Sequence, residues 1–108
     1  MQAERLKILL QLIEDEPNDP FNHYAVAMEY LRNDPPKACA SLAKIAVNFP
    51  DYLPTYYHLA TLFAETNQQQ DAEIIFKKGI LLAEAQANNK ALKELKSAFE
   101  MYKNEWED

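Results

Sequence analysis

The chain repeats an apolar pattern with a period of about 34 residues. The first part of the pattern recurs in the pairs Val26 and Leu59, Ala27 and Ala60, Tyr30 and Phe63. The second part recurs at a spacing that is longer by one position, in the pairs Ala38 and Ala72, Leu42 and Phe76. A repeat of this length is one supersecondary unit that cannot bury its apolar face alone, so neighbouring copies must stack. The difference in spacing means that one residue is missing from the first copy, in the turn after Asn33.

In both copies, and in the residues before and after them, the apolar residues follow helical spacing. Leu6, Leu9, Leu10 and Ile13 fall at i, i+3, i+4 and i+7, which predicts a helix over residues 2–16. The same pattern predicts helices over 21–33, 38–49, 53–66, 72–83 and 91–102. Asp19 and Asp34 each precede a proline. An Asp-Pro dipeptide favours a helix start, because aspartate caps the free amides and proline is tolerated at the first helical position. Asn67 and the three glutamines after it predict a polar turn, and residues 85–89 predict a break.

Composition agrees with one all-helical domain. The 108 residues suffice for a modest core, and only Gly79 is glycine. The net charge of −6 disfavours nucleic acid or an anionic membrane as a partner. A single cysteine, Cys39, permits neither an internal disulfide nor a zinc motif. No apolar stretch approaches the roughly 20 residues that cross a bilayer, and the N-terminal run lacks a signal-peptide cleavage site. A reducing, cytoplasmic location is therefore expected.

The second copy carries a known motif. Tyr56-x-x-Leu59-Ala60-x-x-Phe63, followed by Ala72-x-x-x-Phe76-x-x-Gly79, resembles the tetratricopeptide repeat family. In the first copy Tyr30, Ala38 and Pro50 fit the family pattern, whereas His23, Leu42 and Ile45 replace its Trp, its aromatic residue and its Ala. The resemblance implies an all-α fold in which antiparallel helical hairpins stack as a short right-handed superhelix, an α-solenoid of about six helices.

The repeat also predicts how the single domain, residues 1–108, is divided. Pro17 precedes Pro50 by the same spacing that separates Val26 from Leu59, so residues 1–17 are interpreted as the second half of a repeat that lacks its first half. Residues 20–50 and 53–86 are the two complete repeats, and residues 89–105 form a C-terminal capping helix. Arg5 occupies the position that holds Ala38 and Ala72 in the two repeats, and Lys96 occupies the position of Ala60. A small residue is needed there only where a neighbouring helix packs closely, so a long side chain is expected where that helix is absent.

No group of residues predicts catalysis. The pairs His23 and Tyr24, and Tyr57 and His58, have no Ser, Cys or carboxylate at a motif spacing beside them. One glycine cannot form a Gly-rich phosphate loop. The sequence therefore predicts no enzyme, no catalytic residue, no metal and no cofactor.

The resemblance instead implies binding in a concave groove lined by the first helix of each pair. By position, the candidate partner-binding residues are Tyr24, Met28, Arg32, Tyr57, His58, Thr61, Glu65, Lys93 and Ser97. Tyr24 and Met28 are equally compatible with the core of an ordinary amphipathic helix. A branch of the family grips the C-terminal carboxylate of chaperones, but Tyr24 and Met28 stand where that branch has a basic residue and Asn. An apolar or aromatic-bearing segment is the better expected guest.

Two functions follow from these observations. The first is an adaptor or scaffold that binds a peptide or helical segment of another protein. The alternative is a structural module that self-associates, for instance as a homodimer, because Leu6, Ile8, Leu9 and Leu12 form an open apolar stripe and Tyr102 and Trp106 lie near the other end. Neither nucleic-acid binding nor membrane insertion is predicted.

Overall fold

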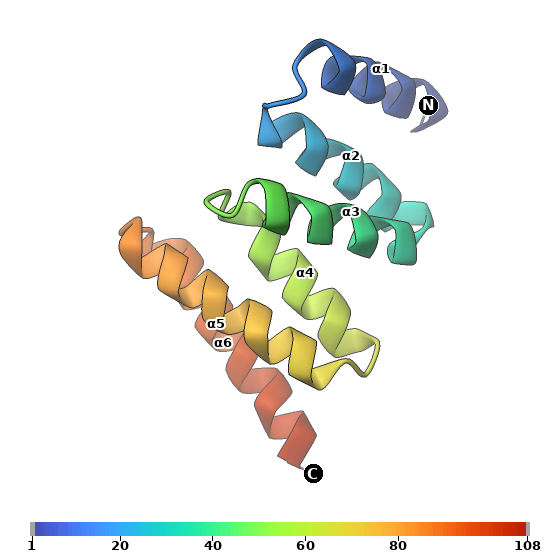
Figure 1. The fold of residues 1–108 in the computed structure, drawn as a ribbon. Helices are drawn as coiled ribbons and strands as arrows, with labels where there is room; N and C mark the ends of the chain where they lie inside the picture. Colours follow the sequence, from blue (N-terminus) through green and yellow to red (C-terminus); the bar gives the residue numbers. More distant parts are fainter. Residues whose placement is uncertain (1, 108) are drawn as a thin grey trace. The chain divides into compact units, whose positions relative to one another are not determined.

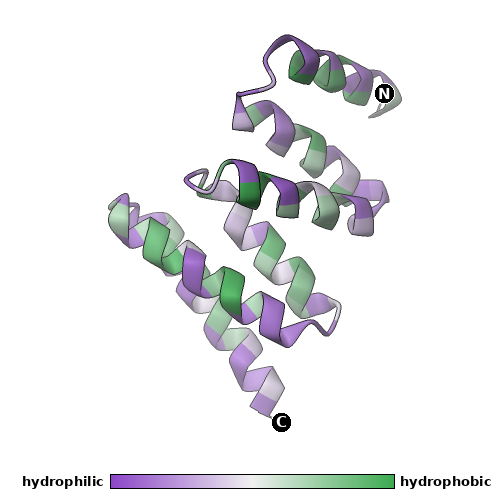
Figure 2. Cartoon of the chain, viewed as in Figure 1, coloured by the Kyte–Doolittle hydropathy of each residue, from purple (hydrophilic) through white to green (hydrophobic). Residues whose placement is uncertain are grey.

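The computed structural model describes residues 2–107, and all regular structure in this range is α-helical. The six helices are α1 (Gln2–Asp15), α2 (Pro20–Asn33), α3 (Pro35–Asn48), α4 (Pro54–Glu65), α5 (Gln69–Ala85) and α6 (Asn89–Glu107), coloured in chain order in Figure 1. The all-α prediction with about six helices is confirmed, and the predicted bounds differ from these by a few positions at the helix ends. Apolar and polar residues alternate along the helices (Figure 2). None of the described helices combines the length and hydropathy needed to span a bilayer.

The helices form two compact units, the first ending at Tyr52 and the second beginning at Leu53. In the first unit α2 packs against both α1 and α3. In the second unit α5 packs against both α4 and α6, and α4 also contacts α6. Each unit therefore contains one complete antiparallel hairpin and one additional helix.

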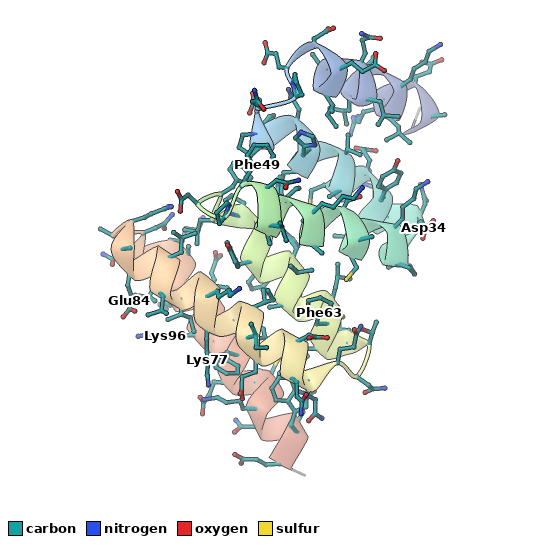
Figure 3. The ribbon with its side chains drawn as sticks, in the orientation of Figure 1. Asp34, Phe49, Phe63, Lys77, Glu84 and Lys96 are labelled. Atoms are coloured by element: carbon teal, nitrogen blue, oxygen red, sulfur yellow. The ribbon has the colours of Figure 1, made fainter. Side chains whose placement is uncertain are left out.

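The helix starts follow the predicted chemistry. Asp19 Oδ1 accepts a hydrogen bond from the Phe21 amide at 3.0 Å, and Asp34 Oδ1 accepts one from the Lys37 amide at 3.3 Å. Figure 3 shows Asp34 at the turn between α2 and α3. A cap of this kind stabilises a helix by about 1 kcal/mol. In both cases a proline occupies the first helical turn, where no hydrogen bond is lost.

The turns of the second unit use left-handed residues other than glycine. Asn67 and Ala87 have φ of 61° and 54°, and each follows the end of a helix. The amides of the next residues, Gln68 and Asn88, bond back to the carbonyls of Phe63 and Ala83 at 2.9 Å each, as in a Schellman motif. The break predicted at 85–89 is present but shorter, because Ala85 ends α5 and Asn89 begins α6.

The polar turn predicted over Asn67 and the three glutamines is wrong in extent. Gln69 and Gln70 already form the first turn of α5. Glutamine is a good helix former, and first-turn amides need no intrahelical partner when they face water. Only the residues up to Gln68 connect α4 and α5.

Burial repeats with the same period as the sequence. Four buried positions of the first helix of a repeat recur one period later: Asn22, Val26, Ala27 and Glu29 correspond to Thr55, Leu59, Ala60 and Leu62. Three buried positions of the second helix recur in the same way: Ala38, Leu42 and Ile45 correspond to Ala72, Phe76 and Gly79. The two hairpins are therefore packed by equivalent residues.

Arg5 and Lys96, which replace the small residues of the repeats, both lie at the surface. Arg5 is largely exposed, and its Nη1 lies 3.2 Å from Oε1 of Glu29, an ion pair that joins α1 to α2. Lys96 is exposed on α6 and points away from the packed helices (Figure 3). A long charged side chain fits these positions because no helix of the described range covers them.

Candidate functional site

Helix α4 divides sharply into a buried and an accessible face. Tyr56, Leu59 and Ala60 are at most 4% exposed. Tyr57, directly after the buried Tyr56, is 40% exposed. Three further predicted residues share the accessible side of this helix: His58 and Thr61 are half-buried, and Glu65 is exposed. The structure thus brings together the four α4 residues predicted from the sequence.

Two of these residues form a fixed aromatic pair. The rings of Tyr57 and His58 pack edge to face, with centroids 5.6 Å apart and an interplanar angle of 84°. Thr61 Oγ1 donates a hydrogen bond to the His58 carbonyl oxygen at 3.0 Å, which leaves the hydroxyl oxygen able to accept one. Burial lowers the pKa of the His58 imidazole, so this ring is neutral near pH 7. The face offers an aromatic surface and hydrogen-bonding groups without a cation.

Helix α6 adds a residue that the sequence analysis did not include among the candidates. Tyr102 is half-buried, and burial raises the pKa of its hydroxyl, with further increases from Glu65, Glu105 and Tyr57 in that order. Tyr102 therefore lies near the accessible side of α4. The sequence singles out Tyr102 only as support for self-association; in the structure its ring packs against Phe76 and Trp106, and the proximity to α4 indicates a further role.

The predicted residues Lys93 and Ser97 are exposed on α6. Neither forms a hydrogen bond or an ion pair with another residue in the described range 2–107. They remain available on the surface of the second unit, on the helix α6 that contacts α4.

The other three predicted residues belong to the first unit. Tyr24 and Met28 are half-buried and Arg32 is exposed, at successive turns of α2. The Tyr24 ring meets the Tyr52 ring edge to face at 5.6 Å, and burial, followed by Tyr52, raises the pKa of the Tyr24 hydroxyl. Neither Tyr24 nor Met28 is a fully buried core residue. Through the repeat period, these three residues are the counterparts of Tyr57, Thr61 and Glu65.

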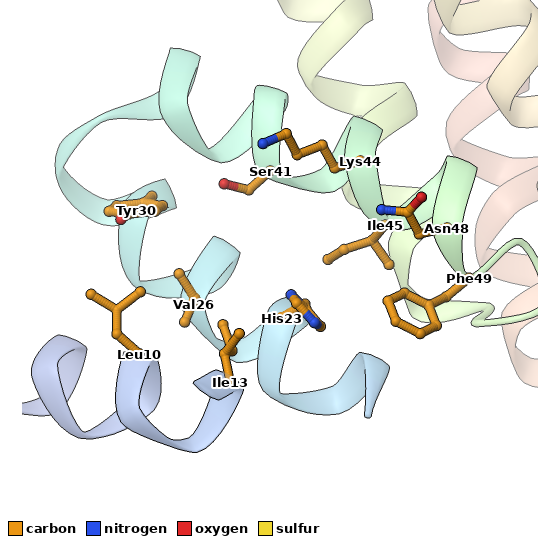
Figure 4. Close-up of a pocket in the computed structure, with 10 residues that line it drawn as sticks. All are labelled: Leu10, Ile13, His23, Val26, Tyr30, Ser41, Lys44, Ile45, Asn48 and Phe49. Atoms are coloured by element: carbon orange, nitrogen blue, oxygen red, sulfur yellow. The ribbon is translucent and has the colours of Figure 1, made fainter. Parts of the chain in front are cut away.

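A cavity of about 380 Å³ lies elsewhere in the first unit, between α1 and α3 and beside α2. Its apolar walls include Leu10 and Ile13 of α1, Val26 of α2 and Ile45 of α3 (Figure 4). At one end His23 packs against Phe49 with ring centroids 5.4 Å apart, while its Nε2 lies 2.8 Å from the Pro17 carbonyl oxygen. Sequence reasoning missed this cavity because it considered only the first helices of the repeats.

No metal site accompanies these surfaces in the described range. Among residues 2–107, no group of three or more His, Cys, Asp or Glu side chains is arranged to hold a metal ion. The accessible faces carry aromatic rings, hydroxyls and isolated charges.

Two hairpins with equivalent buried positions define an α-helical repeat protein. A solution NMR structure of a tetratricopeptide repeat domain protein from Salinibacter ruber is 34% identical, with a TM-score of 0.76 over 82% of this chain and 91% of that chain. A crystal structure of a tetratricopeptide repeat domain protein from the same organism is also 34% identical, with a TM-score of 0.75 over 79% and 97% of the two chains. No protein-family model and no curated protein matches the chain. The chain belongs to the tetratricopeptide repeat family, whose fold is a protein-interaction repeat.

Proposed function

We propose that this chain is a non-enzymatic adaptor that binds a peptide or helical segment of another protein on the accessible faces of its first-of-pair helices. The observation that carries the proposal is the exposure of Tyr57. The neighbouring Tyr56 is buried in the same helix, so Tyr57 is not needed to fill the core. A large aromatic ring that is exposed and yet held by a neighbouring ring is a typical anchor for a protein partner.

In the second unit the proposed surface consists of Tyr57, His58, Thr61, Glu65, Lys93 and Ser97. Tyr57 supplies apolar contact area at a low cost in conformational entropy, because its ring already packs on His58. Glu65 and Lys93 add one charge of each sign and would set the orientation of the guest more than its affinity. This mixture favours a segment with an apolar or aromatic residue over a purely acidic tail.

In the first unit Tyr24, Met28 and Arg32 form the equivalent proposed surface. Met28 replaces Thr61 of the second unit, and a flexible thioether adapts to irregular apolar guests. Arg32 replaces Glu65, so the charge at the end of the helix is inverted between the two repeats. We propose that the two surfaces recognise different parts of the partner.

The double substitution Tyr57→Ala and Thr61→Ala tests the proposal. Removing one aromatic anchor typically costs about 2 kcal/mol or more of binding free energy, which is about 30-fold or more in affinity. Partners captured from lysate by the wild-type chain should be lost from the double variant, and the affinity for an identified partner can then be measured by calorimetry. Helicity and melting temperature should stay unchanged because both side chains lie outside the core. Unaltered capture by the folded double variant would exclude this face.

One observation favours self-association as a second candidate function. Ile8, Leu10 and Leu12 on α1 are 63%, 43% and 39% exposed, which is unusual for three large apolar residues on one short helix. This function requires a dimer whose population rises with concentration in sedimentation experiments. Replacing Ile8 and Leu12 by glutamate should then restore the monomer. A chain that remains monomeric at high micromolar concentration excludes this candidate.

A further inference from the structure

The cavity between α1 and α3 has a polar wall that belongs to a single helix. Ser41, Lys44 and Asn48 of α3 face it at successive turns, opposite Leu10 and Ile13 of α1 (Figure 4). None of these three polar side chains has a hydrogen-bond or ion-pair partner among residues 2–107. The polar wall is therefore unused by the fold itself.

The charge at the cavity is positive although the chain as a whole carries −6. No carboxylate is among the residues that line the cavity. Lys44 lies on its wall, and the ammonium group of Lys37, further along α3 toward its start, sits 4.8 Å from the centroid of the Tyr30 ring, which lines the cavity. A guest with carboxylates would meet these two lysines and no opposing acid on the cavity wall.

Comparison of the two repeats indicates why the cavity is open. The equivalent positions of the second repeat, one period after Ser41 and Asn48, hold Ile75 and Leu82, which pack against the core of the second unit. In the first unit the same positions carry short polar side chains that do not fill the space. The cavity thus arises from two polar residues at positions where the other repeat uses apolar packing.

We propose that this cavity is a second docking site, separate from the first-of-pair helix faces, which takes a bulky apolar side chain from an acidic segment of a partner protein. The apolar residue of the segment lies among Val26, Ile13 and Ile45. Carboxylates beside it pair with Lys44 and Lys37, and its backbone meets Ser41 and Asn48. A guest of this kind makes apolar contacts with one wall and polar contacts with the other.

The test uses two blocked peptides and the ¹⁵N-labelled full chain. One peptide is acetyl-Asp-Glu-Trp-Leu-Glu-amide, and the other has the same apolar residues with lysine in place of each acid. The acidic peptide should shift the amide signals of Val26, Tyr30 and Lys44 in a saturable manner, and the basic peptide should bind more weakly. Lys44→Glu should weaken the acidic peptide about fivefold, the upper range for one exposed charge pair.

Three control variants separate the possible outcomes. Lys78→Glu changes the equivalent exposed lysine of the second unit and should leave binding unchanged. Tyr57→Ala should also leave it unchanged, so failure of this site and failure of the proposed adaptor face are distinguishable. The double substitution Ser41→Ile and Asn48→Leu fills the cavity as the second repeat does, and should abolish binding while raising the melting temperature.

Three results overturn the proposal. The first is equal affinity for the acidic and basic peptides, and the second is acidic-peptide binding that survives Ser41→Ile and Asn48→Leu. The third is a concentration-dependent dimer of the wild-type chain that this double substitution abolishes, because the occupant would then be a second copy.

Discussion

Replacement of Phe76 by alanine is expected to lower the free energy of unfolding by about 3–5 kcal/mol. Phe76 is 0% exposed, and its ring stacks on Phe99 with centroids 5.1 Å apart and lies 6.2 Å from the Tyr102 ring. Alanine would leave a cavity between α5 and α6 that the surrounding rings fill only in part. Because a typical domain has a free energy of unfolding of about 5–15 kcal/mol, this loss is a large fraction of the total stability.

Urea unfolding followed by tryptophan fluorescence measures this effect. Trp106 is the only tryptophan, and its ring contacts Phe99 and Tyr102, so its signal reports on the second unit. Phe76→Leu is the matched control because Leu42 fills the equivalent buried position of the first repeat, and it should cost clearly less than alanine. A loss below about 1 kcal/mol for Phe76→Ala would mean that this stack does not organise the core, since buried Phe→Ala replacements normally cost several times that.

Sequence predicted the part of the fold that depends on repetition. The period predicts packing for Leu59, Ala60, Phe63, Ala72 and Phe76; four of them are buried, and Phe63 is half-buried against the core of the second unit. The reason is physical: a repeat must bury the same positions each time, so a recurring apolar residue marks a recurring contact. The helix starts at Asp19 and Asp34 were also predictable, because capping depends only on neighbouring residues.

The features that the sequence did not predict are those that do not follow from the repeat pattern. Gln69 was assigned to a turn, since polarity alone does not separate a loop from the exposed first turn of a helix. The left-handed Ala87 had no local signal, because alanine has a steric penalty at positive φ that surrounding contacts must offset. The cavity beside Ser41 is visible in sequence only through comparison with Ile75, as a polar residue where the other copy is apolar.

The candidate surface was predicted as residues but not as a geometry. The helical pattern predicts an exposed Tyr57 because Tyr56 and Leu59 fill the inward positions of the helix, and the structure agrees. The edge-to-face packing on His58 and the proximity of Tyr102 depend on rotamers and on the contact between α4 and α6, which no single-helix pattern specifies. In the proposed adaptor, these details determine which partner segment the face accepts.

Replacement of Gly79 by alanine is expected to destabilise the chain, although alanine is the better helix former. A Cβ atom at Gly79 would lie 2.8 Å from Tyr56 Cβ and 3.3 Å from the Leu95 methyl carbons. Tyr56 Cβ is fixed to the backbone of α4, so the helices themselves would have to move apart. Overpacking costs about 1–3 kcal/mol, and the gain in helix propensity offsets about 1 kcal/mol of that. We expect a net loss of up to about 2 kcal/mol, and a larger one for Gly79→Leu, in urea unfolding followed by Trp106 fluorescence.

The adjacent position provides the control for helix propensity. Lys78 is exposed on the same helix, so the difference between Lys78→Ala and Lys78→Gly measures propensity without a steric term, and should be about 1 kcal/mol in favour of alanine. If Gly79→Ala stabilises the chain by the same amount, close approach to Tyr56 is not why glycine stands there. The first repeat solves this packing problem differently: His23 and Ile45 occupy the positions of Tyr56 and Gly79, and both line the cavity. The missing side chain of Gly79 leaves room for Tyr56 in the second hairpin, whereas the first hairpin pairs the smaller ring of His23 with isoleucine.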